Sequence, residues 1–96
     1  MKLETKLKYT QFGRLMHVRD FKKFMAKIPI KTERGEARFE KVKSKLSKLN
    51  AGYVATLEGI EFFSGGYMLA ISELTNKYKV VEPLLMGRDM TLVYVR

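Results

Sequence analysis

The fold is decided by residues 32–52, which read TERGEARFEKVKSKLSKLNAG. Four apolar side chains in this stretch follow a three-four-three spacing: Phe39, Val42, Leu46 and Leu49. On a helix, at about 100° per residue, they form one apolar stripe that can face a core. Thr32 is a suitable N-cap, and Asn50 with Gly52 supplies a left-handed stop. The spacing therefore predicts a helix within residues 32–52.

The charged residues of this predicted helix are sorted by sign. Five basic residues fall on one flank of the apolar stripe, namely Arg34, Arg38, Lys41, Lys45 and Lys48. The preceding segment adds three more, which are Lys22, Lys23 and Lys27. A lysine-rich flank is either a solvated face or a surface that attracts polyanions such as RNA. We take these eight residues as candidate nucleic-acid-binding residues.

Length and composition restrict the class of protein. A chain of 96 residues with 46% hydrophobic content forms one domain, residues 1–96, that can bury a core. The absence of cysteine excludes disulfides and thiolate metal sites, and His17 is the only histidine. We therefore expect no metal and no cofactor. No apolar run reaches the roughly 18 residues of a membrane helix, and the polar start is no signal peptide, so we expect a cytoplasmic protein away from the membrane.

The net charge of +9 is unevenly distributed. Residues 1–52 hold 15 Lys and Arg against 5 Asp and Glu, whereas residues 53–96 hold 4 against 5. A basic field raises the rate of encounter with nucleic acid, acidic proteins and anionic surfaces without choosing among them. The basic potential therefore belongs to the first half of the chain.

Hydrophobic patterns predict the remaining elements. We expect a strand at 2–9, a turn around Gly13, a helix from Val18 that ends at Pro29, and then a helical hairpin with the helix of residues 32–52. His17 is expected at the boundary before the first helix. Strands are expected at 53–63, 67–71, 77–85 and 90–95, with Pro83 at an edge, bulge or strand end. The order is strand, helix, helix and then three or four strands. It predicts an α+β fold in which the helical hairpin covers one face of an antiparallel-rich sheet.

One segment fits two structures. Residues 67–71 follow the turn sequence Ser64-Gly65-Gly66 and are expected to form the second strand of a hairpin. However, Tyr67, Ile71, Leu74 and Tyr78 also follow helical spacing, so residues 67–77 could instead form a helix. We favour the strand and keep the helix as the alternative.

The order of elements, the length and the basic character resemble the RelE/ParE toxin superfamily. The likeness is most visible in residues 60–71, IEFFSGGYMLAI, and in the segment from Val80 to Gly87 with Arg88 and Tyr94. In the RelE branch the resemblance implies ribosome-dependent cleavage of messenger RNA, with Arg88 and Tyr94 as the matching catalytic residues. The ParE branch poisons DNA gyrase by binding. The resemblance also implies an acidic antitoxin whose helix covers an apolar groove beside the sheet.

Two function hypotheses follow. Met68, Glu61 and Phe63 stand where the family commonly has basic residues, so we expect weak or no endonuclease activity. The first hypothesis is a toxin or toxin-like regulatory protein that binds the ribosome or its RNA through the basic helical face. The alternative is a non-catalytic inhibitor or adaptor, of viral origin for example, that binds a protein or a nucleic-acid-binding channel.

Overall fold

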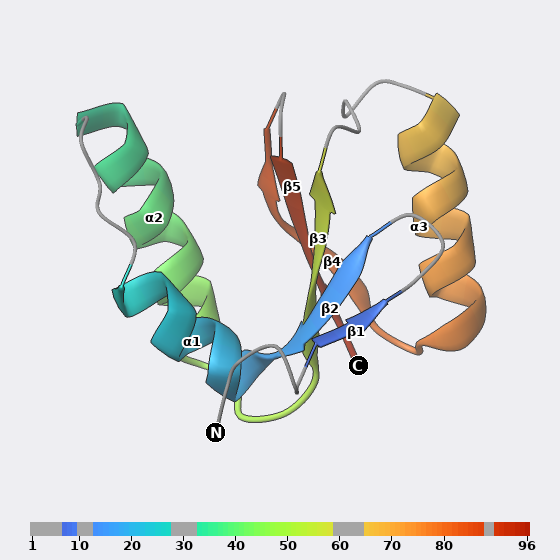
Figure 1. The fold of residues 1–96 in the computed structure, drawn as a ribbon, viewed down its shortest axis with the longest axis horizontal. Coiled ribbons are helices and arrows are strands. Elements are labelled where there is room, and N and C mark those ends of the chain that lie inside the picture. The colour runs from blue at the N-terminus through green and yellow to red at the C-terminus, as the bar shows by residue number, and fades with distance from the viewer. Residues whose placement is uncertain (1–6, 10–12, 28–32, 59–64, 88–89) are drawn as a thin grey trace.

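The computed structural model describes residues 7–9, 13–27, 33–58, 65–87 and 90–96, which form a three-layer α+β fold (Figure 1). The central layer is an antiparallel sheet with strand order β1-β2-β3-β5-β4. Its strands are β1 (Leu7–Tyr9), β2 (Arg14–His17), β3 (Tyr53–Glu58), β4 (Val81–Met86) and β5 (Met90–Val95). The helices are α1 (Val18–Ala26), α2 (Glu33–Leu46) and α3 (Gly65–Lys77). The predicted α+β class and the pair of helices on one face of the sheet are confirmed.

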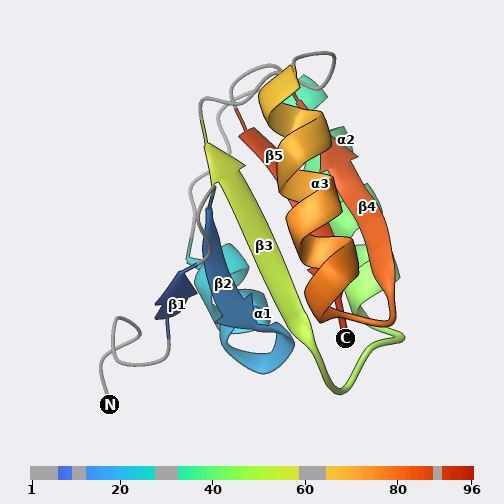
Figure 2. The same cartoon turned by 90° about the vertical axis from the view of Figure 1, so that its right-hand side faces the viewer.

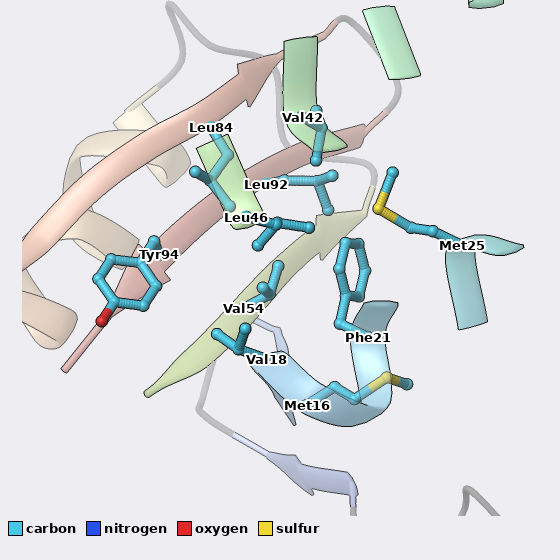
Figure 3. Close-up of a cluster of buried hydrophobic side chains, with 10 residues drawn as sticks. All are labelled: Met16, Val18, Phe21, Met25, Val42, Leu46, Val54, Leu84, Leu92 and Tyr94. Carbon is cyan, nitrogen blue, oxygen red and sulfur yellow. The ribbon is translucent and has the colours of Figure 1, made fainter. Parts of the chain in front are cut away.

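The first face of the sheet is covered by α1 and α2. Ten buried side chains form this core (Figure 3), namely Met16, Val18, Phe21, Met25, Val42, Leu46, Val54, Leu84, Leu92 and Tyr94. The predicted stripe of α2 is confirmed, since Val42 and Leu46 are buried and Phe39 and Leu49 pack partly buried against the same cluster. The helix ends at Leu46, earlier than expected, and Thr32 lies outside the described residues. Apolar burial therefore fixes α2 on the sheet.

The second face of the sheet is covered by α3 (Figure 2), so the strand expected at residues 67–71 is wrong. Tyr67, Ala70 and Leu74 are buried on the inner side of this helix. They share a second core with buried side chains of three strands, namely Leu15, Ala55, Leu57, Val93 and Val95. The helical alternative is the one the chain adopts, because three inward side chains at helical spacing fill this face.

The start of the chain holds a strand that the sequence did not predict. Residues 14–17 form β2 and pair with β3, whereas only a turn around Gly13 was expected between the first strand and the first helix. His17 lies at the expected boundary and caps α1, since its Nδ1 accepts a hydrogen bond from the Arg19 N–H at 3.1 Å. The first expected strand is described only over Leu7–Tyr9, and Pro29 lies outside the described residues.

Strand β4 is an edge of the sheet, and Pro83 lies within it beside a register shift, as expected. A proline has no N–H to offer another strand, so this residue and the irregularity protect the edge from pairing with a second chain. None of the helices in the described part of the chain combines the length and the apolar character needed to cross a membrane.

Candidate binding surface

The outer flank of α2 and the turn that follows it carry a basic row, which we define as Arg38, Lys41 and Lys45 on the helix and Lys48 in the turn. All four side chains are exposed, and among the described residues no carboxylate forms an ion pair with them. Glu40 instead pairs with Lys43 at 3.9 Å, on another face of the helix. Arg38 and Lys45 lie within two turns of α2, about 10 Å apart along the axis. The row therefore presents uncompensated positive charge to solvent.

The other basic candidates do not form one surface with this row. Lys23 and Lys27 are exposed, at the middle and the end of α1. Lys22 is half-buried, and its Nζ donates a hydrogen bond to the Leu49 carbonyl at 2.8 Å, so it has a structural role. Arg88 and the side chain of Arg34 lie outside the described residues.

Two of the candidate residues hold the connection between α2 and β3. Lys22 reaches Leu49, and the Tyr94 hydroxyl donates to the Ala51 carbonyl at 2.9 Å. The Val18 N–H donates to the Gly52 carbonyl at 3.0 Å. Three hydrogen bonds from α1 and β5 therefore hold residues 49–52, which connect the end of α2 to β3.

Tyr94 is 3% exposed and lies in the core between the sheet and the two helices (Figure 3). A general acid or base must reach the reacting group within hydrogen-bond distance. The Tyr94 hydroxyl is committed to a backbone carbonyl, so this geometry favours a structural role over the catalytic one expected from the resemblance.

We expect Tyr94→Phe to lower the free energy of unfolding by about 1 kcal/mol, because the substitution removes the bond to the Ala51 carbonyl. Urea denaturation measures the change, and binding to the partner proposed below should be unaffected. Tyr78→Phe is the control, since no hydrogen bond of the Tyr78 hydroxyl is present among the described residues. If Tyr94→Phe keeps the stability and the partner binding of the wild type but loses its effect on the target, Tyr94 would again be a catalytic candidate.

An apolar cleft of about 180 Å³ lies beside the basic row, between α2 and the ends of β4 and β5. Its lining consists of Arg38 with Gly35, Phe39, Val42, Leu85, Met90 and Leu92. Met90 is 39% exposed at the cleft, and Met86 nearby in the chain is 52% exposed. The cleft is smaller than the roughly 300–1,000 Å³ of most small-molecule sites, but it can receive one apolar anchor of a partner. The resemblance implied an apolar groove beside the sheet, but the sequence did not indicate the residues that line this cleft, because its two walls come from segments more than 40 residues apart.

A larger groove of about 440 Å³ lies between α1 and α2 and is lined by Lys22, Met25, Lys43, Leu46 and Ser47. Its polar groups already have partners within the chain. Lys22 binds the Leu49 carbonyl, Lys43 lies near Glu40, and the Ser47 hydroxyl donates to the Ser44 carbonyl at 2.7 Å. This groove therefore offers few free polar groups to orient a ligand.

The remaining electrostatic features lie away from the row. Arg14 pairs with Glu58 across β2 and β3 at 2.8 Å, and burial raises the pKa of the Tyr67 phenol above its ordinary value. Among the described residues no group of three or more His, Asp or Glu side chains is placed to hold a metal ion. The row and the adjoining cleft are thus the features that suggest binding of a macromolecule.

No protein-family model, curated protein or solved structure matches this chain. The resemblance to the RelE/ParE superfamily stays a hypothesis. Its most visible motif was expected to be a central hairpin, but residues 65–77 form α3, and residues 60–64 lie outside the described part of the chain.

Proposed function

We propose that this protein is a non-catalytic inhibitor or adaptor that binds an acidic segment of a partner protein. The observation that carries the proposal is the position of Arg38, which belongs both to the basic row and to the wall of the apolar cleft. A partner that fills both features needs an apolar side chain followed by carboxylates. An amphipathic acidic helix has this pattern, with its apolar anchor in the cleft and its acidic residues along the row.

The cleft favours protein over RNA as the partner. Arg38 is the one lining residue whose side chain offers a strong hydrogen-bonding group. The other side chains of the lining are apolar, and the Met90 sulfur is only a weak acceptor. Burial of an aliphatic or aromatic side chain there is worth about 1.5–3 kcal/mol. A base that buries a polar edge without a partner loses about 1–3 kcal/mol for each such group. RNA could use the row, but it gains less from the cleft.

The position of Tyr94 supports a protein that acts by binding to its target and blocking it, without catalysis. Its buried hydroxyl donates a hydrogen bond to the Ala51 carbonyl, so this residue is poorly placed for proton transfer to a substrate. An inhibitor that blocks its target by binding needs no general acid or base. The position of Tyr94 therefore supports the form of the toxin-like hypothesis in which the protein blocks its target by binding over the form in which it cuts RNA.

A pull-down of the tagged protein from cell lysate, with and without nuclease treatment, tests the proposal. One variant, Lys41→Gln with Lys45→Gln and Lys48→Gln, removes three charges of the row. A second, Met90→Gln, makes the cleft polar without changing the charge. We expect a protein partner that survives nuclease treatment, with affinity lowered about 10- to 100-fold in the first variant and at least about 5-fold in the second.

The matched control carries Lys43→Gln, Lys77→Gln and Lys79→Gln, which give the same net charge but leave the row intact. It should retain the partner. Equal losses in the control and in the row variant would show that only net charge matters. Nuclease-sensitive capture that is indifferent to Met90→Gln would replace the proposal with the RNA-binding hypothesis.

A further inference from the structure

The outer face of α3 is uncharged. Its exposed residues lie on one side of the helix and are Gly65, Met68, Leu69, Ser72, Thr75 and Asn76. Lys77, the exposed charged residue of this helix, lies on one flank, where it pairs with Glu73 at 3.2 Å. By contrast, the exposed residues of α2 are mostly charged. In a chain with 30% charged residues, this face is therefore set apart from the rest of the surface.

The centre of this face is apolar. Met68 and Leu69 are 66% and 60% exposed, the highest values among the large apolar side chains of the described residues. One turn before and after them lie Gly65 and Ser72, which are small. Small side chains on both sides of a protruding apolar pair allow a second helix to approach closely.

We propose that the outer face of α3 binds the same face of a second copy of this chain. The argument for this occupant is electrostatic. The basic row lies on α2 and the turn after it, Lys23 and Lys27 lie on α1 and at its end, and both helices are on the opposite side of the sheet from α3 (Figure 1). Two copies that meet through α3 keep their basic rows far apart, so this approach keeps the Coulomb repulsion between the two rows low, although each chain carries a net charge of +9. An acidic partner or a nucleic acid would find no free cation at the centre of this face.

The spacing of the face suits a two-fold axis. With the axis between Met68 and Leu69, an antiparallel pair of helices places Gly65 of one copy opposite Ser72 of the other, and it brings the Met68 side chains together on one side of the axis and the Leu69 side chains on the other. The helix is about 20 Å long, so the contact belongs to the small interfaces below about 1,200 Å². The dimer is accordingly weak and dependent on concentration. It would present two basic rows pointing away from each other, which raises the avidity for a target with repeated acidic sites.

Sedimentation velocity from about 10 to about 500 μM protein, in about 0.1 and 0.5 M NaCl, tests the proposal. We expect the mass to rise from monomer toward dimer with concentration, and to rise further at the higher salt. Salt screens the repulsion between the two copies but does not weaken an apolar contact. Leu69→Glu should remain a monomer in all conditions, because it places two carboxylates beside the axis. It should fold normally, since the side chain is exposed and glutamate is a good helix former.

Met86→Glu is the matched control, because it adds the same charge at another exposed apolar side chain and should still dimerise. A wild-type monomer throughout, an association that weakens with salt, or a dimer that survives Leu69→Glu would overturn the proposal. The outcome is separable from the partner binding proposed above, which should weaken with salt and persist in Leu69→Glu at low concentration.

Discussion

Replacement of Leu46 by alanine is expected to lower the free energy of unfolding by about 2–5 kcal/mol. Leu46 is 1% exposed and lies between α2 and the sheet, in the cluster that contains Val42, Phe21 and Leu92 (Figure 3). The substitution removes three carbon atoms and leaves a cavity that the two rigid layers cannot close. A domain of this size has a total stability of about 5–15 kcal/mol, so a large part of it would be lost.

Urea denaturation followed by circular dichroism measures this change. Lys45→Ala, at the neighbouring exposed position of the same helix, is the control and should stay within about 0.5 kcal/mol of the wild type. A loss below about 1 kcal/mol for Leu46→Ala would mean that α2 is not packed on the sheet at this point. The placement of the basic row beside the cleft would then also be contradicted, because it depends on the packing of α2 on the sheet.

The elements predicted correctly are those whose pattern has one explanation. The apolar stripe of α2 has a helical period and residues 90–95 have the composition of a strand; both elements are observed, with β5 at its expected bounds. Pro83 restricted β4 to an edge, a bulge or a strand end, because proline has no N–H to donate to a neighbouring strand. The end of α2 was placed too late, because the Ser47 hydroxyl binds the Ser44 carbonyl and backbone turns replace the helix before Gly52.

The helix α3 could not be assigned from its own sequence, because its apolar residues fit both periods. The deciding information lies in other segments. Residues 92–95 are apolar without interruption, and a strand that is buried on both faces has such a run. Val93 and Val95 therefore require cover on the face that α1 and α2 do not reach, and α3 supplies it. The expectation of a single helical layer overlooked this requirement.

The candidate surface was predicted in part. Exposure of Arg38, Lys41 and Lys45 follows from the position of the apolar stripe, because the flank of a helix that packs by one side must face solvent, whereas Lys48 is exposed in the turn after the helix. Sequence patterns carry no information on hydrogen bonds between distant residues. The structural roles of Lys22 and Tyr94, and the cleft beside Arg38, therefore appeared only once the layers were assembled.

Replacement of Gly52 by alanine is expected to cost about 3 kcal/mol or more of folding free energy. Gly52 has a φ of 101°, where a residue with a side chain is strained by about 1–3 kcal/mol. An added Cβ would also lie 2.7 Å from the Val95 carbonyl oxygen and 2.8 Å from the ring of Tyr94. The backbone oxygen cannot move without disturbing the end of β5, so the turn before β3 must shift.

Gly65→Ala is the matched control for this glycine. No atom lies within 4 Å of a Cβ added there, and the position belongs to a helix, so we expect stability that is unchanged or raised by up to about 1 kcal/mol. Thermal and urea denaturation of both variants would show the contrast. Similar stability of the two would contradict the close approach of residue 52 to β5.

The same substitution tests how the connection between α2 and β3 supports binding. A displaced residue 52 weakens the hydrogen bond from the Val18 N–H to the Gly52 carbonyl, a bond that Tyr94→Phe leaves in place. Because this connection joins α2 to β3, the tilt of α2 relative to β4 and β5 should change and the cleft beside Arg38 should open. We therefore expect Gly52→Ala to bind the partner more weakly even at temperatures where it is fully folded. Tyr94→Phe, which keeps the glycine, should bind normally, and equal binding by all three proteins would show that the cleft does not depend on this connection.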